Sequence, residues 1–399
     1  PVATSALQCG AAGEVRMSNA GQPLSVQFVT TSLMQGGAEV QVFLLAAELK
    51  RRGHTVTLVS MRDAEAFESE LQELEIPFHS LAMQRGIGDP RALFKLANVV
   101  RANRPDVVHS HMVHANLLTR LARLLSPMPV QISTAHNYSE GARWRELAYR
   151  VTDPLCDLTT NVCRLCVEHF VAVGATPKAR IKYMPNGLDL ANFQPQPGAR
   201  EAKRQELGIA PGTFLWLAVG RLEEQKDYPN LIEAVRQLAA RNDAAPTTIL
   251  VAGEGNLHGE LDRLVQAAGL DGAHFRMLGA RKDVVDLMAA ADAYVMSSAW
   301  EGLPMVLLEA GASRLPAVVT DVGGNREVVT DGKTGFVVPP RDPTALAEAM
   351  LRLMQLGEDE TRAMGEAAHH EIELNFGLAG VVDQWEAVYR ELLARRGKA

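Results

Sequence analysis

Two glutamates, Glu301 and Glu309, enclose the apolar segment EGLPMVLLE and are the first candidates for chemistry in this chain. Pro304 is typical of the first turn of a helix, so the segment predicts a helix that begins just after a strand. A helix start offers backbone amides to an anion, and carboxylates accept hydrogen bonds from hydroxyl groups. A ligand that combines an anion with hydroxyls, such as a nucleotide sugar, would satisfy both. The alternative is structural: Glu301 would cap the helix, and Glu309 would pair with a lysine or an arginine.

Two cations, Arg221 and Lys226, lie five residues apart in the segment VGRLEEQKDYPNL, which follows an apolar strand. Cations at the carboxyl end of a strand suit a diphosphate, with arginine as a planar fork and lysine as a point charge. We favour this function. The alternative is a solvated loop, because most exposed lysines and arginines have no special role.

A pair of glycines, Gly36 and Gly37, stands in the segment MQGGAEV after the first predicted strand. Glycine allows backbone conformations that other residues resist, and amides at a helix start suit a phosphate or a sugar hydroxyl. A tight turn with no ligand is an equal alternative. The G-x-G-x-x-G pattern of dinucleotide-binding proteins is absent, which argues against a dinucleotide.

Three histidines, His109, His111 and His114, lie in the segment VVHSHMVHAN at the end of another predicted strand. Strand alternation places His109 and His111 on the same side. No carboxylate follows at a spacing suited to a metal, so we expect one histidine to line a ligand site and the others to be packed in the core.

The cysteines indicate neither zinc binding nor a disulfide framework. Cys163 and Cys166 form a lone C-x-x-C with His169 nearby, and this set is incomplete for zinc. We therefore expect reduced, buried thiols and no metal or other cofactor.

Composition is that of a soluble globular protein, with 47% hydrophobic and 22% charged residues. The chain has no apolar run long enough for a transmembrane helix. Residues 1–23, rich in Ala, Gly and Ser, predict a disordered tail without a signal peptide. The formal net charge of -7 is uneven: residues 1–200 carry 20 Lys and Arg against 17 Asp and Glu, and residues 201–399 carry 20 against 30. Either the front half meets an anionic partner or the difference is chance.

Short apolar strands alternate with amphipathic helices, which predicts an α/β protein with parallel, doubly wound sheets. Strands are expected over 25–31, 54–60, 106–111, 130–134 and 158–163, and again over 213–220, 247–255, 293–298, 316–321 and 335–340. Helices are expected over 38–53, 89–105, 229–242 and 378–397. A segment rich in Pro, Gly and Asn begins at 185 and predicts a linker over 186–212. Two Rossmann-like halves are therefore expected, each with its ligand site beyond the carboxyl ends of its strands.

In this order, several motifs together resemble family 4 of the retaining glycosyltransferases. The matching segments are GGAE, LKRRGHTVTLV, PDVVHSH, MPNGLDLANFQP, VGRLEEQKD, VAGEG, MLGARKDV, SSAWEGLPMVLLEAGA and TDVGGNREVVTDGKTGFVVPP. The resemblance spans roughly 24–390 and implies the GT-B fold, in which two Rossmann-like domains face each other across a cleft. It also implies a C-terminal helix that returns to the N-terminal domain. The implied boundaries are 1–23 for the tail, 24–190 and 191–377 for the domains, and 378–399 for the helix.

The same resemblance assigns roles to individual residues. The family's E-x7-E pattern is matched by Glu301, which would contact hydroxyls of the donor sugar, and by Glu309, which would contact the ribose. The implied catalytic residues are His111, Glu301, Arg221 and Lys226. The implied donor contacts are Gly36, Gly37, Arg221, Lys226, Gly279, Arg281, Glu301, Gly302, Leu303, Pro304, Met305, Val306 and Glu309. No essential metal is implied. Cys163 departs from the family, which often has serine there, so a hydroxyl contact would be lost.

These features predict transfer of a sugar from a nucleoside diphosphate sugar, with UDP favoured, to a hydroxyl of a glycan or lipid-linked acceptor in polysaccharide or cell-surface glycan synthesis. Two alternatives stay open: a GT-B epimerase acting on a sugar nucleotide, and a catalytically silent sugar-nucleotide-binding protein. No nucleic-acid partner is expected. The basic amphipathic stretches 91–104 and 116–125 suggest contact with an anionic membrane, although ordinary helices packed on a sheet are the favoured alternative. A cytoplasmic enzyme, acting at the inner face of the membrane where contact occurs, is the expected setting.

Overall fold

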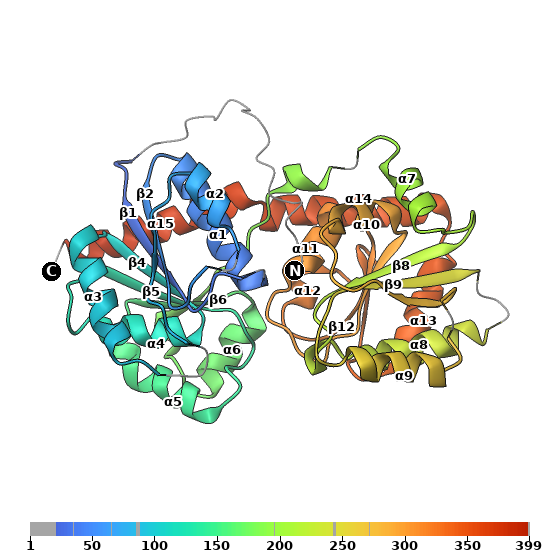
Figure 1. Ribbon diagram of the computed structural model, residues 1–399, viewed down its shortest axis with the longest axis horizontal. Coiled ribbons are helices and arrows are strands. Elements are labelled where there is room, and N and C mark those ends of the chain that lie inside the picture. Colours follow the sequence, from blue (N-terminus) through green and yellow to red (C-terminus); the bar gives the residue numbers. More distant parts are fainter. Residues whose placement is uncertain are drawn as a thin grey trace. The chain divides into compact units, whose positions relative to one another are not determined.

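The computed structural model describes residues 21–34, 36–64, 66–84, 88–194, 196–241, 245–270 and 272–397. Most of the tail expected over 1–23 lies outside these residues. Within them, contacts divide the chain into two compact units (Figure 1). The C-terminal unit comprises residues 189–376, and the N-terminal unit comprises residues 21–188 together with 377–397. The boundaries expected from the sequence were 190/191 and 377/378.

The N-terminal unit contains a parallel sheet of seven strands in the order β3-β2-β1-β4-β5-β6-β7. Its strands are β1 (Ser25–Thr30), β2 (Thr55–Ser60), β3 (Phe78–Ser80), β4 (Val107–His111), β5 (Val130–Ala135), β6 (Leu158–Asn161) and β7 (Ile181–Tyr183). The order reverses between β1 and β4, where the chain turns back past the first strand. Such a reversal leaves room for a ligand beyond the carboxyl ends of the two strands.

Helices cover both faces of this sheet. They are α1 (Gly37–Arg51), α2 (Glu68–Glu73), α3 (Arg91–Asn103), α4 (Val113–Ala122), α5 (Arg143–Thr152) and α6 (Arg164–Ala172), with short 3-10 helices η2 (Asp153–Leu155) and η3 (Lys178–Arg180). Alternate strand residues such as Val29 and Val108 pack against α3 and α4 through Leu96 and Ala115. Their neighbours Phe28 and His109 point to the opposite face, where His109 contacts Trp385 of the last helix.

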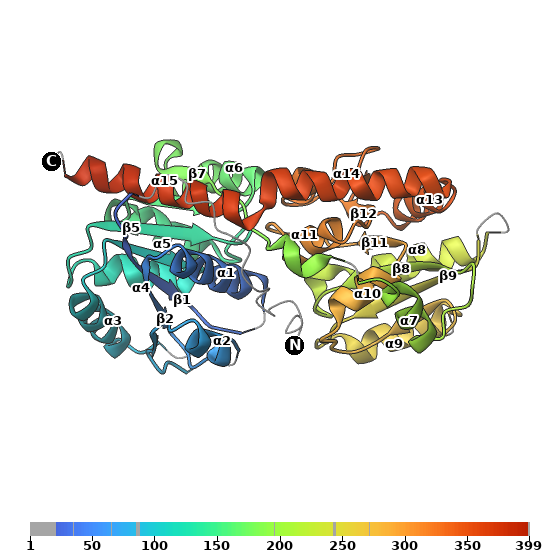
Figure 2. The same cartoon turned by 90° about the horizontal axis from the view of Figure 1, so that it is seen from above.

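That last helix, α15 (Leu378–Arg396), packs on the N-terminal unit along α1 and β5 (Figure 2). The guanidinium of Arg52 bonds both Asp383 at 2.6 Å and Glu386 at 3.0 Å. The Tyr389 hydroxyl lies 2.8 Å from Nδ1 of His109 inside the unit. The expected return of the C-terminal helix to the N-terminal domain is confirmed.

The C-terminal unit contains a second parallel sheet, of six strands in the order β10-β9-β8-β11-β12-β13. Its strands are β8 (Phe214–Val219), β9 (Thr247–Ala252), β10 (Phe275–Met277), β11 (Ala293–Met296), β12 (Ala317–Thr320) and β13 (Gly335–Val338). Its helices are η4 (Leu190–Phe193), α7 (Ala199–Glu206), η5 (Glu224–Lys226), α8 (Tyr228–Ala239), α9 (His258–Ala267), α10 (Val284–Ala290), α11 (Met305–Ala312), α12 (Asn325–Val328), α13 (Pro343–Met354) and α14 (Glu358–Phe376). Here the strand order reverses between β8 and β11. The prediction of two doubly wound Rossmann-like halves is confirmed.

Two details of the sequence-based prediction are wrong. The linker expected over 186–212 contains helix α7, whose segment AREAKRQE consists of strong helix formers. The cysteines Cys163 and Cys166 form a disulfide at the start of α6, so this pair is not reduced, whereas Cys156 is free and buried. The spacing of the C-x-x-C over the first turn of a helix brings the two sulfurs together.

Candidate functional site

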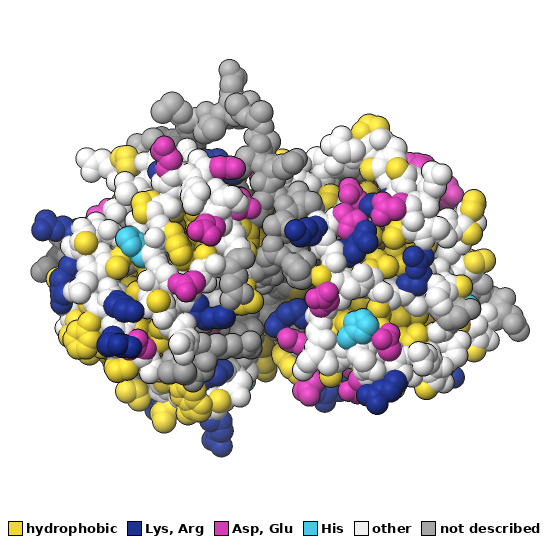
Figure 3. All heavy atoms as spheres, viewed as in Figure 1, with side chains coloured by type: hydrophobic (Ala, Val, Ile, Leu, Met, Phe, Trp, Pro, Cys, Tyr) yellow, Lys and Arg dark blue, Asp and Glu magenta, His cyan; other side chains and the backbone are white. Residues whose placement is uncertain are grey.

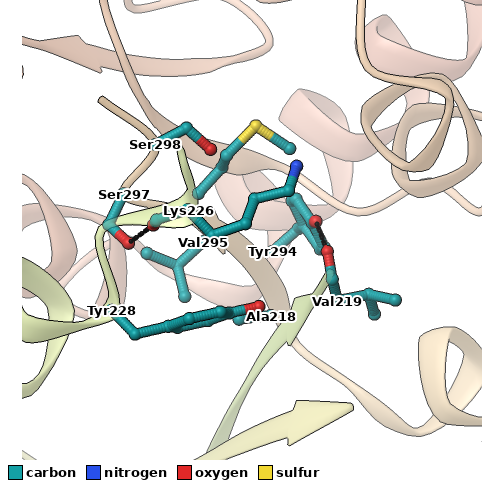
Figure 4. Close-up of a pocket in the computed structure, with 9 residues that line it drawn as sticks. Ala218, Val219, Lys226, Tyr228, Tyr294, Val295, Ser297 and Ser298 are labelled. Atoms are coloured by element: carbon teal, nitrogen blue, oxygen red, sulfur yellow. Dashed lines mark hydrogen bonds between the residues drawn. The ribbon is translucent and has the colours of Figure 1, made fainter. Parts of the chain in front are cut away.

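The best-formed part of the site lies in the C-terminal unit, beyond the carboxyl ends of the neighbouring strands β8 and β11. A pocket opens at this point (Figure 4). It is lined by Ala218, Val219, Lys226, Tyr228, Tyr294, Val295, Met296, Ser297 and Ser298. Two hydrogen bonds connect residues that line this pocket. The Tyr294 hydroxyl donates to the Val219 carbonyl at 3.2 Å, and the Ser297 hydroxyl donates to the Lys226 carbonyl at 2.8 Å.

Lys226 and Glu301 form an ion pair beside this pocket, with Nζ and Oε1 2.6 Å apart. The same carboxylate accepts from the Ser298 hydroxyl at 2.8 Å and from the Gln225 side chain at 3.0 Å. Glu301 is buried, with 5% of its surface exposed, so these donors compensate a charge that has lost most of its water. The lysine ammonium has three hydrogens, and Glu301 engages one of them, so others stay available to an anion.

Glu309, the fifth residue of α11, is also buried but has a different environment. Among the described residues, none donates a hydrogen bond to its carboxylate or forms an ion pair with it. Burial raises the pKa of this carboxyl to about 7. The structural alternative had Glu309 paired with a lysine or an arginine. In the structure Glu301 has the cationic partner, Lys226, and Glu309 has none among the described residues. A buried carboxylate without a donor is suited to accept hydrogen bonds from a ligand's hydroxyls.

The start of α11 lies between the two glutamates. Pro304 is the residue before the first helical turn, and no side chain caps the amides that follow it at Met305 and Val306. Ahead of it, the Gly302 carbonyl accepts from the amide of Gly324 at 2.7 Å, which fixes the turn that carries Glu301. Uncapped amides at a helix start favour an anionic ligand.

The neighbouring segment at Gly323 requires glycine. Its φ of +52° is a left-handed conformation, and a Cβ there would lie 2.3 Å from the Glu301 carbonyl oxygen. This backbone approach holds the turn around Glu301 in place. In the sequence, TDVGGNREVV stands out only as part of the family resemblance, and nothing in its residue types reveals this supporting role.

Three other predicted residues of this unit have distinct surroundings. Arg221 is exposed and pairs only with Glu223, at 3.0 Å, among the described residues. Gly279 has a φ of +69° and its carbonyl accepts from the Gly253 amide at 2.8 Å. The guanidinium of Arg281 is held by Asp283, with Nε to Oδ1 at 2.7 Å. Arg281 thus has a structural partner already, whereas the Arg221 side chain extends into solvent.

In the N-terminal unit, Gly36 and Gly37 follow β1 and begin α1. Gly36 is extended, with a φ of -105°, so the expectation that its conformation excludes other residues is wrong. A Cβ there would lie 2.5 Å from Oε2 of Glu39, the end of a flexible side chain that can move aside, so space does not require glycine here either. That carboxylate accepts from the Ser32 hydroxyl at 2.7 Å, so it lies folded back over the glycine.

His111 ends β4, paired in register with Thr30 at the end of β1, so it lies at the reversal point of this sheet. Its ring lies 4.1 Å from that of His109 between centroids, which confirms that the two share a face. His109 is satisfied within the core by Tyr389 and Thr134. His111 bonds through Nδ1 to Nε2 of His136 at 3.0 Å.

The Nε2 atom of His111 is buried without a partner among the described residues. Burial lowers the pKa values of His111 and His136, so both rings are neutral at pH 7. The next residue, Met112, has a φ of +69° and a ψ of 152°, a conformation that is rare outside glycine and that often marks a functional site. Of the three histidines, His111 has the environment of a ligand contact.

Sequence reasoning missed the hydrogen-bond partners of two site residues: Gln225 and Ser298, which bond Glu301, and His136, which bonds His111. Ser298 and Gln225 are conspicuous only once Glu301 is placed beside them, because neither has a spacing that marks it. Within the residues that the structure describes, no cluster of His, Cys, Asp or Glu has the arrangement of a metal site. No helix among the described residues is long and apolar enough to span a membrane.

The two Rossmann-like sheets, with cations and carboxylates at the reversal point of the second one, provide a site for an anionic ligand that carries hydroxyl groups. Two family descriptions match the chain: Glycosyltransferase Family 4 over residues 35–192, and Glycosyl transferases group 1 over residues 199–371. Together they cover most of the sequence. The chain belongs to glycosyltransferase family 4.

Curated relatives agree. A UDP-Gal:alpha-D-GlcNAc-diphosphoundecaprenol alpha-1,3-galactosyltransferase of Escherichia coli is 25% identical over 321 residues, covering 78% of this chain and 81% of that protein. A D-inositol 3-phosphate glycosyltransferase of Corynebacterium diphtheriae is 29% identical over 389 residues, covering 89% of each. The crystal structure of Anabaena HepE in complex with UDP superimposes with a TM-score of 0.80 at 22% identity, over 92% of this chain and 100% of that one. At this identity the likeness concerns the fold.

Proposed function

We propose that this glycosyltransferase moves a hexose or N-acetylhexosamine from a UDP-sugar to a hydroxyl of a glycan or lipid-linked acceptor, with retention at the anomeric carbon. The observation that carries the proposal is the arrangement around α11. There, an ion-paired Glu301 and an unpartnered Glu309 flank a helix start with uncapped amides, beside Lys226. That order of groups matches the order of sugar, diphosphate and ribose in the donor.

The diphosphate is the natural ligand of Lys226 and of the amides of Met305 and Val306. Lys226 is held in place by Glu301 before any ligand binds, so little ordering is needed to place its charge. Arg221 is free to move toward the distal phosphate, because its one partner among the described residues is the exposed Glu223. The ribose hydroxyls then satisfy the carboxylate of Glu309. Binding without a metal ion stays a prediction, which titration in the presence of a chelator would test.

The proposed reaction breaks the bond between the anomeric carbon and the β-phosphate oxygen, and it forms a bond from that carbon to the acceptor oxygen. The acceptor proton passes to the departing phosphate oxygen, so the products are the glycoside and UDP. Lys226 and the α11 amides stabilise the charge that develops on the diphosphate. Glu301 has both carboxylate oxygens engaged by neighbouring donors, which suits orientation of the sugar rather than nucleophilic attack.

Two of the similar proteins support the choice of substrates. The E. coli relative is named for a UDP-galactose donor and for a sugar acceptor on a diphosphoundecaprenol lipid. The Anabaena HepE structures contain UDP, UDP with glucose, and UDP-glucose. A UDP-hexose donor and a lipid-linked acceptor are therefore our first choices for this chain, and they imply work at the inner face of a membrane.

A thermal-shift screen of UDP-, GDP- and ADP-sugars tests the donor, since a ligand that binds the folded state raises the melting temperature by mass action. We expect stabilisation by UDP and one or more UDP-sugars. Proton NMR of the product with the selected donor then reports the anomeric configuration. Equal shifts with all bases would refute the UDP assignment, and an inverted anomer would refute retention. Conversion of the donor without any acceptor would instead support the epimerase alternative.

A further inference from the structure

Exposed large apolar side chains gather on one helical layer of the N-terminal unit. Most of those found among the described residues lie on α5, on α6 with its C-terminal turn, and at the end of α4. They are Leu121, Leu124, Trp144, Leu147, Val151, Leu165 and Val173. In Figure 3, hydrophobic side chains crowd the lower left of the molecule, over α5. A concentration of this kind marks an interaction surface more often than scattered apolar residues do.

Helix α5 is the centre of this layer, and its outer side is unusual. The exposed residues between 143 and 152 are two arginines and three large apolar residues: Arg143, Trp144, Leu147, Arg150 and Val151. We call these five residues the α5 face. The spacings of three and four residues put them on one side of the helix. Trp144, Leu147 and Val151 are 58%, 59% and 69% exposed, although the outer side of a surface helix is ordinarily polar.

The charges of this helix are arranged for an anionic partner. Neither Arg143 nor Arg150 forms a hydrogen bond or an ion pair with any described residue. The one acidic residue of α5, Glu146, is directed elsewhere, toward Ser139 at 3.4 Å and His169 at 3.8 Å. The α5 face therefore presents two uncompensated positive charges beside its apolar side chains.

The sequence-based alternative for such a surface was the pair of stretches 91–104 and 116–125. In the structure, one face of each stretch packs on the sheet, as at Leu96, Val100 and Ala122. Phe94, Leu121 and Leu124 are exposed but do not lie together on one helix face as the α5 residues do. Periodicity alone could not separate these sheet-packed helices from α5, whose apolar residues point outward.

We propose that the α5 face docks on an anionic lipid bilayer, with Trp144, Leu147 and Val151 in the headgroup region and Arg143 and Arg150 on lipid phosphates. Arginine next to tryptophan on a short amphipathic helix suits the membrane interface. A bilayer fits this face better than a second copy of the chain, because a symmetric dimer through the α5 face would bring the arginines of the two copies together. The biological role of this contact rests on the proposed lipid-linked acceptor, which would lie in the membrane. The structural evidence for the contact comes from the α5 face alone.

Vesicle flotation of the full chain tests this proposal. We expect flotation with phosphatidylcholine vesicles that contain phosphatidylglycerol, little with pure phosphatidylcholine, and a loss of binding as salt rises. Arg143→Gln with Arg150→Gln should weaken binding by about five-fold per arginine. Trp144→Ser with Leu147→Gln should weaken it at least ten-fold.

Matched controls lie on α14 of the other unit, where Leu374 is 66% exposed and the side chain of Arg362 is 71% exposed. Leu374→Gln and Arg362→Gln should float as the wild type does. Circular dichroism melts check that every variant folds, and calorimetric titration with UDP should be the same for all of them. UDP binding without flotation overturns the membrane proposal and leaves the proposed function intact. Flotation that the α5 variants do not reduce, or a dimer in sedimentation that Trp144→Ser abolishes, overturns it as well.

Discussion

Lys226 and Glu301 come from the loops after two adjacent strands, β8 and β11, and their charged groups meet at 2.6 Å. The pair joins the two loops at the point where the sheet reverses its order. It also sets the position of a cation before any ligand arrives. Because the lysine and the carboxylate lie on separate loops, a substitution at one of them leaves the loop that carries the other unchanged.

Removal of either cation should weaken nucleotide binding. Lys226→Ala and Arg221→Ala each delete a charge-assisted contact to the diphosphate worth roughly 1.5–3 kcal/mol, so UDP affinity should fall about ten- to hundred-fold. Isothermal titration calorimetry measures it. Lys333→Ala, which removes a lysine paired with Glu371 on the surface, is the control and should bind as the wild type does. An unchanged affinity for UDP in both site variants would contradict the assignment of these cations to the diphosphate.

The two glutamates should affect different kinetic constants. Glu309→Gln alters a contact to the ribose, which does not change during the reaction, so it should raise KM and weaken binding of free UDP. Glu301→Gln keeps an oxygen that can accept from Lys226 but disturbs orientation of the sugar, so it should lower kcat and leave the affinity for free UDP nearly unchanged. Titration of UDP beside steady-state kinetics separates the effects. The opposite pattern would show that the two roles are exchanged.

Stability should depend on pH through Glu309. Burial raises its carboxyl pKa from an ordinary 4.5 to about 7, so the folded state keeps a proton that the unfolded chain releases. The contribution is complete below pH 4.5 and is lost as pH rises through about 7, by roughly 3 kcal/mol. Urea unfolding should find Glu309→Gln more stable than the wild type at about pH 8, with a smaller difference at about pH 5. A difference that stays constant over this range would contradict the assignment.

Gly323 should tolerate no side chain. In Gly323→Ala, the new Cβ would lie 2.3 Å from the Glu301 carbonyl oxygen, and the left-handed φ adds strain of about 1 kcal/mol or more. Gly332→Ala has a similar φ of +74° with open space around it, so it serves as the matched control. Thermal melts should show Gly323→Ala to be the less stable by about 2 kcal/mol. Equal losses would mean that the backbone approach has no consequence.

The sequence predicted the longer elements because their periodicity is strong, and it predicted the site residues that follow strands. Three-residue strands such as β3, β7 and β10 are too short to show alternation, so none was expected. The Lys226–Glu301 pair could not be predicted either, since it depends on which strands are adjacent. Arg281 was named as a donor contact, and its guanidinium pairs with Asp283, a contact that residue types alone do not reveal. The roles of His111 and Glu309 in binding stay predictions.

The position of α15 has a consequence for synthesis on the ribosome. The C-terminal unit is one continuous segment, 189–376, and it is bounded by Leu188 and Gly377, which form a β-bridge with each other. Translation therefore delivers this unit whole while the N-terminal unit still lacks Asp383 and Glu386, the partners of Arg52. The N-terminal unit, which is translated first, is therefore complete only after α15 has been translated. A nascent chain truncated near residue 376 should contain a folded C-terminal unit and a protease-sensitive N-terminal unit.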